Sequence, residues 1–348
     1  MPRLSQQSRK SRHSAMSMQG VRPGPPAGVH VNARCRFRNR HLVYGLMIES
    51  ELPLTSVHEA AGGDGCADLT ILAGSPDYFR AVAPGGPRDP EDWIEHVVLG
   101  DGSVYMKSSE VFEATISANG RTAICRMLGD VEQRAFEANL LNFVVSASLT
   151  LQGEETLHAT VLEMEGRAVG LLGRSGAGKS TLAAYLISRG ADLITDDMLR
   201  VSFAGDTILA YPGPYRLKLL DKPATGFLPD AVADGHFNAL SGKIMVRPRR
   251  EVHHHRGPSR LAALFHLGEP DDETVTEISS IRLNGLELAK TLMSSAMDTR
   301  YASSRRMENQ IRFVARVADL LPVHALRYPR TVAALDGVAR EIRRIIGP

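Results

Sequence analysis

The sequence has few cysteines, few aromatic residues and no long apolar run, and each shortage excludes a class of protein. Only three cysteines occur among 348 residues, and they form neither a C-x-x-C pair nor a zinc-ligand spacing. Because they are odd in number and far apart, a disulfide framework is not expected, and a reducing, cytoplasmic environment fits best. No apolar run reaches the roughly 18 residues that a membrane-spanning helix needs, so we expect no membrane contact.

Acidic residues are missing from the first 40 residues, which contain eight arginines and one lysine. The formal charge of the whole chain is only +2, so the remainder is mildly acidic. Residues 1–30 are rich in Ser, Arg, Pro and Gly and cannot bury an apolar core, so we expect a disordered basic extension. Such an arm either binds nucleic acid or an anionic surface, or is dispensable. We favour the dispensable extension and do not expect a nucleic-acid partner.

Residues 31–150 have the pattern of a small β-rich domain that ends in a linking helix. Short apolar or alternating runs between Gly, Asn and Asp residues predict strands or hairpins. Single strands are expected at residues 42–48, 68–72, 111–116 and 122–128, and a hairpin at residues 98–106. From residue 130 onward, apolar residues recur at helical spacing, at Phe136, Leu140, Phe143 and Val144. No motif in this region carries chemistry of its own.

A complete G-x-x-x-x-G-K-[ST] motif occupies residues 173–180, between an apolar run that predicts a buried strand and a run of good helix formers. The glycines let backbone N–H groups turn toward an anion, and the start of the helix adds a favourable dipole. We therefore expect ATP as a ligand, with the Lys179 ammonium at its β- and γ-phosphates and the Ser180 hydroxyl on Mg²⁺. The candidate nucleotide-binding residues are Gly173, Arg174, Ser175, Gly176, Ala177, Gly178, Lys179, Ser180 and Thr181.

A pair of acidic residues, Asp196 and Asp197, follows the loop after one predicted helix and one predicted strand. This order places both carboxylates at a strand end beside the phosphate loop. One carboxylate there can hold Mg²⁺, and the other can take a proton from an attacking hydroxyl group. An ATP-binding cassette is excluded, because no second signature of the L-S-G-G-Q kind is followed by an apolar run and Asp-Glu.

Three segments together resemble the catalytic domain of HPr kinase/phosphorylase. They are residues 158–166, which begin with His158, the loop at residues 173–180, and residues 189–197, which read R-G-A-D-L-I-T-D-D. The resemblance implies an α/β fold, namely a P-loop kinase domain of the HPr kinase/phosphoenolpyruvate-carboxykinase-like type over residues 151–348, with C-terminal helices. It also implies roles: Asp196 as general base toward a serine hydroxyl, Asp197 and Ser180 as Mg²⁺ ligands, and His158 as an aid to the base.

The chain departs from that family in two places. The family's glycine-rich signature after the acidic pair is missing, which argues against HPr itself as acceptor and against phosphorolysis. A Tyr-Gly pair at residues 44–45 and a Tyr-Pro-Gly-Pro run at residues 211–214 are similar to HPr-kinase-related proteins of peptide-modification clusters. In that setting Arg216, Lys218 and Lys243 are candidate phosphate or substrate contacts, or else solvated surface cations.

The sequence therefore predicts an ATP- and Mg²⁺-dependent kinase that acts on a serine of a protein or peptide. A small-molecule alcohol kinase on the same core and a non-catalytic ATP-binding regulator are the alternatives. The family resemblance leaves a homo-oligomer open. Beyond the site, we expect a strand at residues 260–267, a helix with the stripe Ile311, Val314, Val317 and Leu321, a strand at residues 323–328 and a final amphipathic helix.

Overall fold

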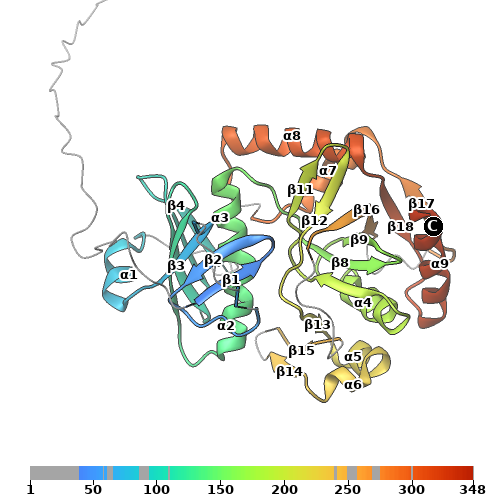
Figure 1. Ribbon diagram of the computed structural model, residues 1–348, viewed down its shortest axis with the longest axis horizontal. Coiled ribbons are helices and arrows are strands. Elements are labelled where there is room, and N and C mark those ends of the chain that lie inside the picture. Colours follow the sequence, from blue (N-terminus) through green and yellow to red (C-terminus); the bar gives the residue numbers. More distant parts are fainter. Residues whose placement is uncertain are drawn as a thin grey trace, which may run out of the picture. The chain divides into compact units, whose positions relative to one another are not determined.

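The computed structural model describes residues 39–57, 59–60, 66–85, 94–108, 110–238, 241–248, 257–268, 275–298 and 301–347. The predicted basic extension, residues 1–30, lies outside these stretches. All of the described residues fall within one unit of the chain, residues 37–348, and their fold is mixed α/β (Figure 1).

The first part of that unit forms a seven-stranded sheet in the order β1-β2-β3-β7-β6-β5-β4. Its neighbours pair antiparallel except for β2 with β3 and β3 with β7, which are parallel. The strands are β1 (Asn39–Val43), β2 (Leu46–Ser50), β3 (Leu69–Ala73), β4 (Ile94–Val98), β5 (Val104–Ser108), β6 (Phe112–Ile116) and β7 (Thr122–Met127). A short helix, α1 (Pro76–Val82), follows β3.

The single strand predicted at residues 42–48 is wrong, because the structure has a hairpin there. Strands β1 and β2 are joined by Tyr44 and Gly45, whose φ values of 55° and 68° are both positive. Two positive φ values in a two-residue connection are typical of the turns that match the twist of an antiparallel pair. Hydrophobic patterning cannot reveal this turn, because Tyr44 is as apolar as the strand residues around it and is fully buried.

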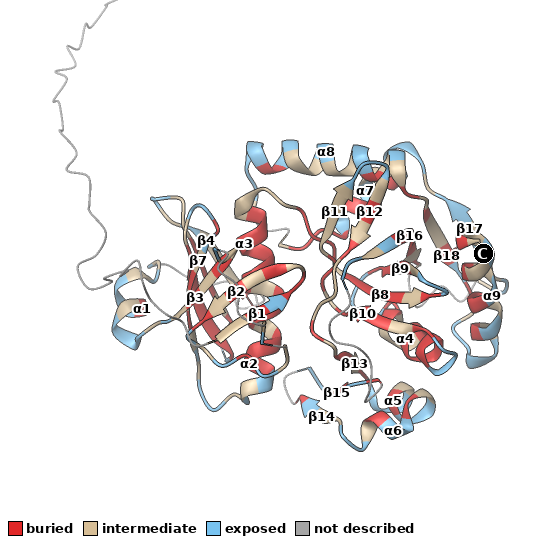
Figure 2. Ribbon diagram, viewed as in Figure 1, coloured by how far each residue is buried: buried red, intermediate tan, exposed pale blue. Residues whose placement is uncertain are grey.

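A nearly continuous helical segment follows the sheet and consists of α2 (Gln133–Asn139), the π-helical turn η1 (Leu140–Val144) and α3 (Val145–Gln152). Figure 2 shows that α2 and α3 are largely buried. Of the predicted stripe, Phe136, Leu140 and Val144 share one core with apolar residues of the seven strands, and Phe143 packs against its edge. The segment ends at Gly153, whose φ of 92° suits a left-handed helix cap.

The second sheet has eight strands, and β9 and β16 are neighbours near its middle. Alternate residues of β9 face opposite sides: Val169 and Leu171 share a core with the helix after the loop, whereas Ala168 and Leu172 share another with later helices. The strands are β8 (Ala159–Met164), β9 (Arg167–Leu172), β10 (Asp192–Thr195), β11 (Val201–Ala204), β12 (Thr207–Ala210), β16 (Ser259–Leu267), β17 (Ser279–Arg282) and β18 (Val323–Arg327).

A small three-stranded sheet and six helices complete the described chain. The small sheet has the order β13-β15-β14 and comprises β13 (Leu217–Leu219), β14 (His236–Asn238) and β15 (Lys243–Val246). The helices are α4 (Lys179–Ser188), α5 (Asp221–Phe227), α6 (Pro229–Val232), α7 (Gly285–Ser294), α8 (Ser304–Leu320) and α9 (Leu335–Ile346), the last preceded by the 3₁₀ turn η2 (Val332–Ala334). No described helix is long and apolar enough to cross a bilayer.

The strands predicted at residues 260–267 and 323–328 are present as β16 and β18. The stripe predicted for α8 is only partly buried, because Val317 lies in the core while Ile311 is 58% exposed. The ring of Phe313 instead meets that of Phe203, at 6.1 Å between centroids. A helix that touches its sheet through one side buries a narrower stripe than the sequence spacing suggests.

The hairpin turn at Tyr44 packs against the Tyr-Pro-Gly-Pro run at residues 211–214. The Tyr44 backbone N–H donates to the Pro212 carbonyl oxygen at 2.8 Å. A Cβ added at Gly213 would lie 2.2 Å from Thr195 Oγ1 and 2.6 Å from Tyr44 Cε1. Gly213 therefore leaves room for the Thr195 and Tyr44 side chains, which any larger residue at this position would displace.

We predict that Gly213→Ala lowers the free energy of unfolding by about 1–3 kcal/mol, the usual range for overpacking. Urea unfolding of the purified protein measures this change. Gly226→Ala is the matched control, because Gly226 lies in α5 with nothing within 4 Å of an added Cβ. Alanine in a helix is favoured over glycine by up to about 1 kcal/mol, so the control should be neutral or stabilising. Equal effects of the two substitutions would contradict the steric argument.

Candidate functional site

Three chain segments meet at one edge of the second sheet because of the directions of their strands. Strand β8 runs antiparallel to both β9 and β10, so β9 and β10 run in the same direction on either side of it. Register pairs Ala159 with Leu172 and Val161 with Thr195. The amino end of β8 therefore lies beside the carboxyl ends of β9 and β10. These three ends carry His158, the phosphate loop and the acidic pair.

The phosphate loop has the backbone that its glycines allow. Gly173, Gly176 and Gly178 have φ values of 139°, 85° and 89°, a region that residues with a side chain rarely adopt. Helix α4 begins directly after Gly178. The buried Lys179 ammonium donates to the carbonyl oxygens of Gly173 and Arg174, at 2.6 and 3.1 Å. Burial lowers the pKa of Lys179, against the opposing effect of the nearby carboxylates Asp196 and Asp197.

The Asp196 carboxylate is buried and fully oriented by hydrogen bonds. Thr160 Oγ1 donates to Asp196 Oδ1 at 2.7 Å, and the Lys218 backbone N–H donates to Asp196 Oδ2 at 3.0 Å. Burial first, and then the charge of Asp197, raise the pKa of Asp196 to about 6, although the two hydrogen bonds act in the opposite direction. A carboxylate with this pKa is ionised at neutral pH and still basic enough to accept a proton.

Asp197 has the opposite electrostatic environment. Its backbone is left-handed, with a φ of 72°. Its Oδ2 atom lies 2.5 Å from the Lys218 ammonium and accepts a hydrogen bond from Asn142 Nδ2 at 2.7 Å. Burial alone would raise the pKa of Asp197, but the Lys218 charge and hydrogen bond, and then the Asn142 amide, hold it well below its usual value. Neighbouring residues thus have strongly separated proton affinities.

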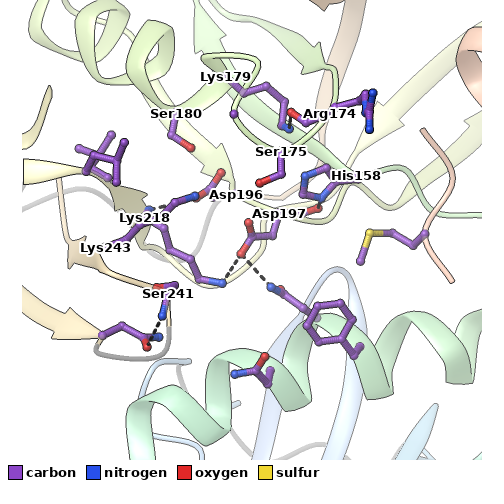
Figure 3. Close-up of a pocket in the computed structure, with 18 of the residues that line it drawn as sticks. His158, Arg174, Ser175, Lys179, Ser180, Asp196, Asp197, Lys218, Ser241 and Lys243 are labelled. Atoms are coloured by element: carbon purple, nitrogen blue, oxygen red, sulfur yellow. Dashed lines mark hydrogen bonds and ion pairs between the residues drawn. The ribbon is translucent and has the colours of Figure 1, made fainter. Parts of the chain in front are cut away.

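His158 lies on the opposite side of Asp197 from Lys218 (Figure 3). Its Nδ1 atom is 3.0 Å from the Asp197 carbonyl oxygen, which can only accept, so Nδ1 carries the proton. Burial and the charge of Lys179 lower the pKa of the imidazole, which is therefore neutral at pH 7. A neutral ring with a protonated Nδ1 has an unprotonated Nε2, which can accept a hydrogen bond.

These groups line one cavity of about 860 Å³. Most of the predicted site residues lie around it: His158, Arg174, Ser175, Gly176, Gly178, Lys179, Ser180, Thr181, Asp196, Asp197, Lys218 and Lys243. Gly173 and Ala177 belong to the loop but are buried and do not line the cavity. Figure 3 shows the Ser175 and Ser180 side chains of the loop pointing toward the acidic pair.

Of the three candidate phosphate or substrate contacts, Lys218 and Lys243 line this cavity and Arg216 does not. Its guanidinium group donates to Ser56 Oγ at 3.0 Å and to the Ala138 carbonyl oxygen at 3.4 Å. The alternating pattern of residues 216–219 predicts a strand with Arg216 and Lys218 on one face. However, β13 begins only at Leu217, so strand alternation does not extend to Arg216.

The sequence reasoning also missed a group of lining residues from the region before residue 150. Asn139, Asn142 and Phe143 of the helical segment line the cavity, together with Ser108, Glu110 and Val111. Phe143 was assigned to a core stripe, and the two asparagines belong to no motif. No local signal identifies Asn142, because its hydrogen bond to Asp197 joins residues 55 positions apart.

The residues present are suited to Mg²⁺. No group of three or more His, Cys, Asp or Glu side chains could hold an ion by itself among the residues that the structure describes. Magnesium is commonly bound by one or two carboxylates together with substrate phosphates and water, not by a cage of protein ligands. The ionised Asp197 and the Ser180 hydroxyl on the same cavity fit that pattern.

Comparison with known proteins identifies the segment that carries the loop and the acidic pair. Residues 149–226 match the model of the HPr Serine kinase C-terminal domain. This part of the chain is HPr-kinase-like. The resemblance inferred from the three motifs is thereby confirmed for this segment, which includes His158, the loop, the acidic pair and Lys218.

Three curated relatives are named HPr kinase/phosphorylase. That of Aromatoleum aromaticum is 41% identical over 71 residues, which cover 20% of this chain and 23% of the relative. That of Exiguobacterium sibiricum is 27% identical over 113 residues, or 32% and 35% of the two chains. That of Shouchella clausii is 26% identical over 152 residues, or 43% and 46%. The chain thus spans less than half the length of each of these relatives.

A solved structure of the HPr(Ser) kinase/phosphatase from Coxiella burnetii aligns with 55% of this chain and 99% of its own, at 14% identity. The TM-score of 0.28 is too low to establish a shared overall arrangement.

We predict that Asp196→Asn stabilises the metal-free protein at neutral pH more than at pH 4–5. The folded-state pKa of Asp196, about 6, exceeds that of an unfolded aspartate. Protonation of Asp196 therefore favours the folded state at low pH, and this contribution to stability is lost as the pH rises through about 6. The uncharged amide avoids this loss. Unfolding in EDTA at several pH values measures the difference. Asp206→Asn, the same change at an exposed turn, is the control, and an Asp196→Asn difference that shrinks toward neutral pH would refute the assignment.

Proposed function

We propose that this chain is an ATP- and Mg²⁺-dependent phosphotransferase that transfers the γ-phosphoryl group to a serine hydroxyl of a protein or peptide. The observation that supports it most is the acidic pair beside the phosphate loop, whose two carboxylates have pKa values displaced in opposite directions. Transfer to a hydroxyl group uses one carboxylate to hold the metal ion and another to accept the hydroxyl proton, and pKa values displaced in opposite directions suit these two roles.

Asp196 is the general base in this proposal. One of its oxygens takes the proton of the acceptor hydroxyl while the acceptor oxygen forms a bond to the γ-phosphorus. The bond between that phosphorus and the β,γ-bridging oxygen breaks, and ADP leaves. Thr160 and the Lys218 backbone N–H hold the carboxylate in one orientation, which removes the need to order it during the reaction.

Asp197 and Ser180 would hold Mg²⁺, which neutralises charge on the phosphates when bound. Lys179 and Lys218 place two further positive charges on the cavity, and Lys243 lies close enough to lower the pKa of Lys179. His158, neutral and with a free Nε2, would accept a hydrogen bond beside the transferred group and so assist the base. Each role is thus consistent with the local environment of the side chain that performs it.

The proposal includes the organisation of the chain. Residues 151–348 would form a P-loop kinase domain of the HPr kinase/phosphoenolpyruvate-carboxykinase-like type, and residues 31–150 a β-rich domain before it. Lys179, Ser180, Asp196 and Asp197 together argue against a non-catalytic regulator, which needs no base. A small-molecule acceptor remains the competing substrate class.

We predict that Asp196→Asn reduces the rate of phosphate transfer about 10²–10⁴-fold while ATP binding is retained, as expected when a general base is lost. Single-turnover transfer of labelled γ-phosphate to a serine peptide, compared with free serine and a sugar, measures the rate and the acceptor class. Asp206→Asn, the same change at an exposed turn, should transfer at the wild-type rate. If Asp196→Asn transferred phosphate at the wild-type rate, Asp196 would not be the general base. If the wild type transferred phosphate to free serine alone, a peptide acceptor would be excluded.

We also predict that the transfer rate falls about tenfold for each pH unit below about 6, because protonated Asp196 cannot accept the hydroxyl proton. Above that pH the rate should level off until other groups titrate. A profile of the single-turnover rate from pH 5 to 8 at saturating ATP and Mg²⁺ tests this. A flat profile across that range would show that no group with this pKa acts as base.

A further inference from the structure

Asn142 connects the region before residue 150 to the acidic pair. Its Nδ2 atom donates to Asp197 Oδ2 at 2.7 Å, the same oxygen that lies 2.5 Å from the Lys218 ammonium. No described residue donates a hydrogen bond to the other carboxylate oxygen, Asp197 Oδ1. Asn142 also precedes residues 149–226, so the HPr-kinase-like segment does not include it.

The backbone around Asn142 is unusual. Residues 140–144 form a π-helical turn between two α-helical stretches. Such turns are rare, and they occur frequently at functional sites because the inserted residue redirects side chains. Here Leu140, Leu141 and Val144 lie in the apolar core, whereas Asn142 lines the cavity. The π turn thus brings one polar side chain of a buried helix to the acidic pair.

The energetics of Asn142 do not favour a structural role. Its side chain is almost fully buried, and its Oδ1 atom has no hydrogen-bond partner among the described residues. A buried acceptor without a partner destabilises the folded state, whereas an apolar residue of similar size avoids that loss. The hydrogen bond from Nδ2 to Asp197 is therefore the interaction that explains an asparagine at this position.

Arg216 links the helical segment to β13, the strand whose Lys218 contacts the carboxylates of Asp196 and Asp197. Its guanidinium group donates to the carbonyl oxygen of Ala138 in α2. Two residues later, Lys218 contacts Asp196 through its backbone N–H and Asp197 through its ammonium group. The helix that carries Asn142 and the strand that carries Lys218 are thus held together beside Asp197.

We propose that Asn142 is a positioning residue for Asp197, so that the region before residue 150 completes the catalytic centre. With Lys218 it holds Oδ2 and leaves Oδ1 free for the cation. This inference rests on the proposed function only in assigning Asp197 to the metal ion.

The test is Asn142→Leu, which removes the donor and the unpaired acceptor at similar volume, with Asn142→Ser as a second variant that adds no bulk. Electron paramagnetic resonance of Mn²⁺ with a non-hydrolysable ATP analogue measures metal affinity without requiring turnover. We expect both variants to weaken Mn²⁺ binding about 10–100-fold, as for other residues that orient metal ligands. Nucleotide binding without metal and the Tm should stay close to wild type.

Ser146→Ala is the matched control, because Ser146 lies one turn further along the same buried helix and, among the described residues, its hydroxyl bonds only to the Phe143 carbonyl oxygen. It should bind Mn²⁺ as the wild type does. Wild-type Mn²⁺ affinity in both Asn142 variants, or an equal loss in Ser146→Ala, would overturn the inference. If the wild type transfers no phosphate but the Asn142 variants still lose Mn²⁺ affinity, the proposed function fails and the positioning role stands.

Discussion

Two adjacent aspartates, Asp196 and Asp197, are the constraint on which the rest of the site depends. Neighbouring buried carboxylates repel each other, and each ionises only as far as its surroundings compensate. The protein compensates unequally: Lys218 and Asn142 hold the charge of Asp197, while burial leaves Asp196 more basic than an ordinary aspartate. This asymmetry makes two chemical roles possible from one dipeptide. Every other element at the site is arranged around it.

The topology of the second sheet brings the residues of the site together with short connecting loops. Because β8 runs antiparallel between β9 and β10, the residue before β8 and the residues after β9 and β10 reach the same edge. His158, the phosphate loop and the acidic pair therefore meet without long connections. The hairpin at Tyr44 packs behind the pair, against Thr195 and Pro212, where a larger residue than Gly213 would not fit.

Some of the site could be predicted because its information is local. The loop glycines, Lys179 and Ser180 are recognisable from one strand-loop-helix segment, and the acidic pair follows at a spacing set by one helix and one strand. Arg216 was misplaced because an alternation rule was extended one residue beyond the strand. Asn142 was overlooked because asparagine in an apolar helix has no sequence signal. The turn at Tyr44 was missed because an apolar residue with a positive φ looks like strand.

The sequence by itself determined the conformation of the glycine loop and the position of the acidic pair beside it, since backbone conformation at glycines and the order of short elements are local properties. Only the tertiary structure decided how the two carboxylates differ and which side chains hold them. Proton affinity depends on burial and on charges that arrive from distant parts of the chain: Lys218 from β13 and Asn142 from the π turn. No spacing rule encodes those contacts, because they form only when both sheets and the helical segment between them are packed.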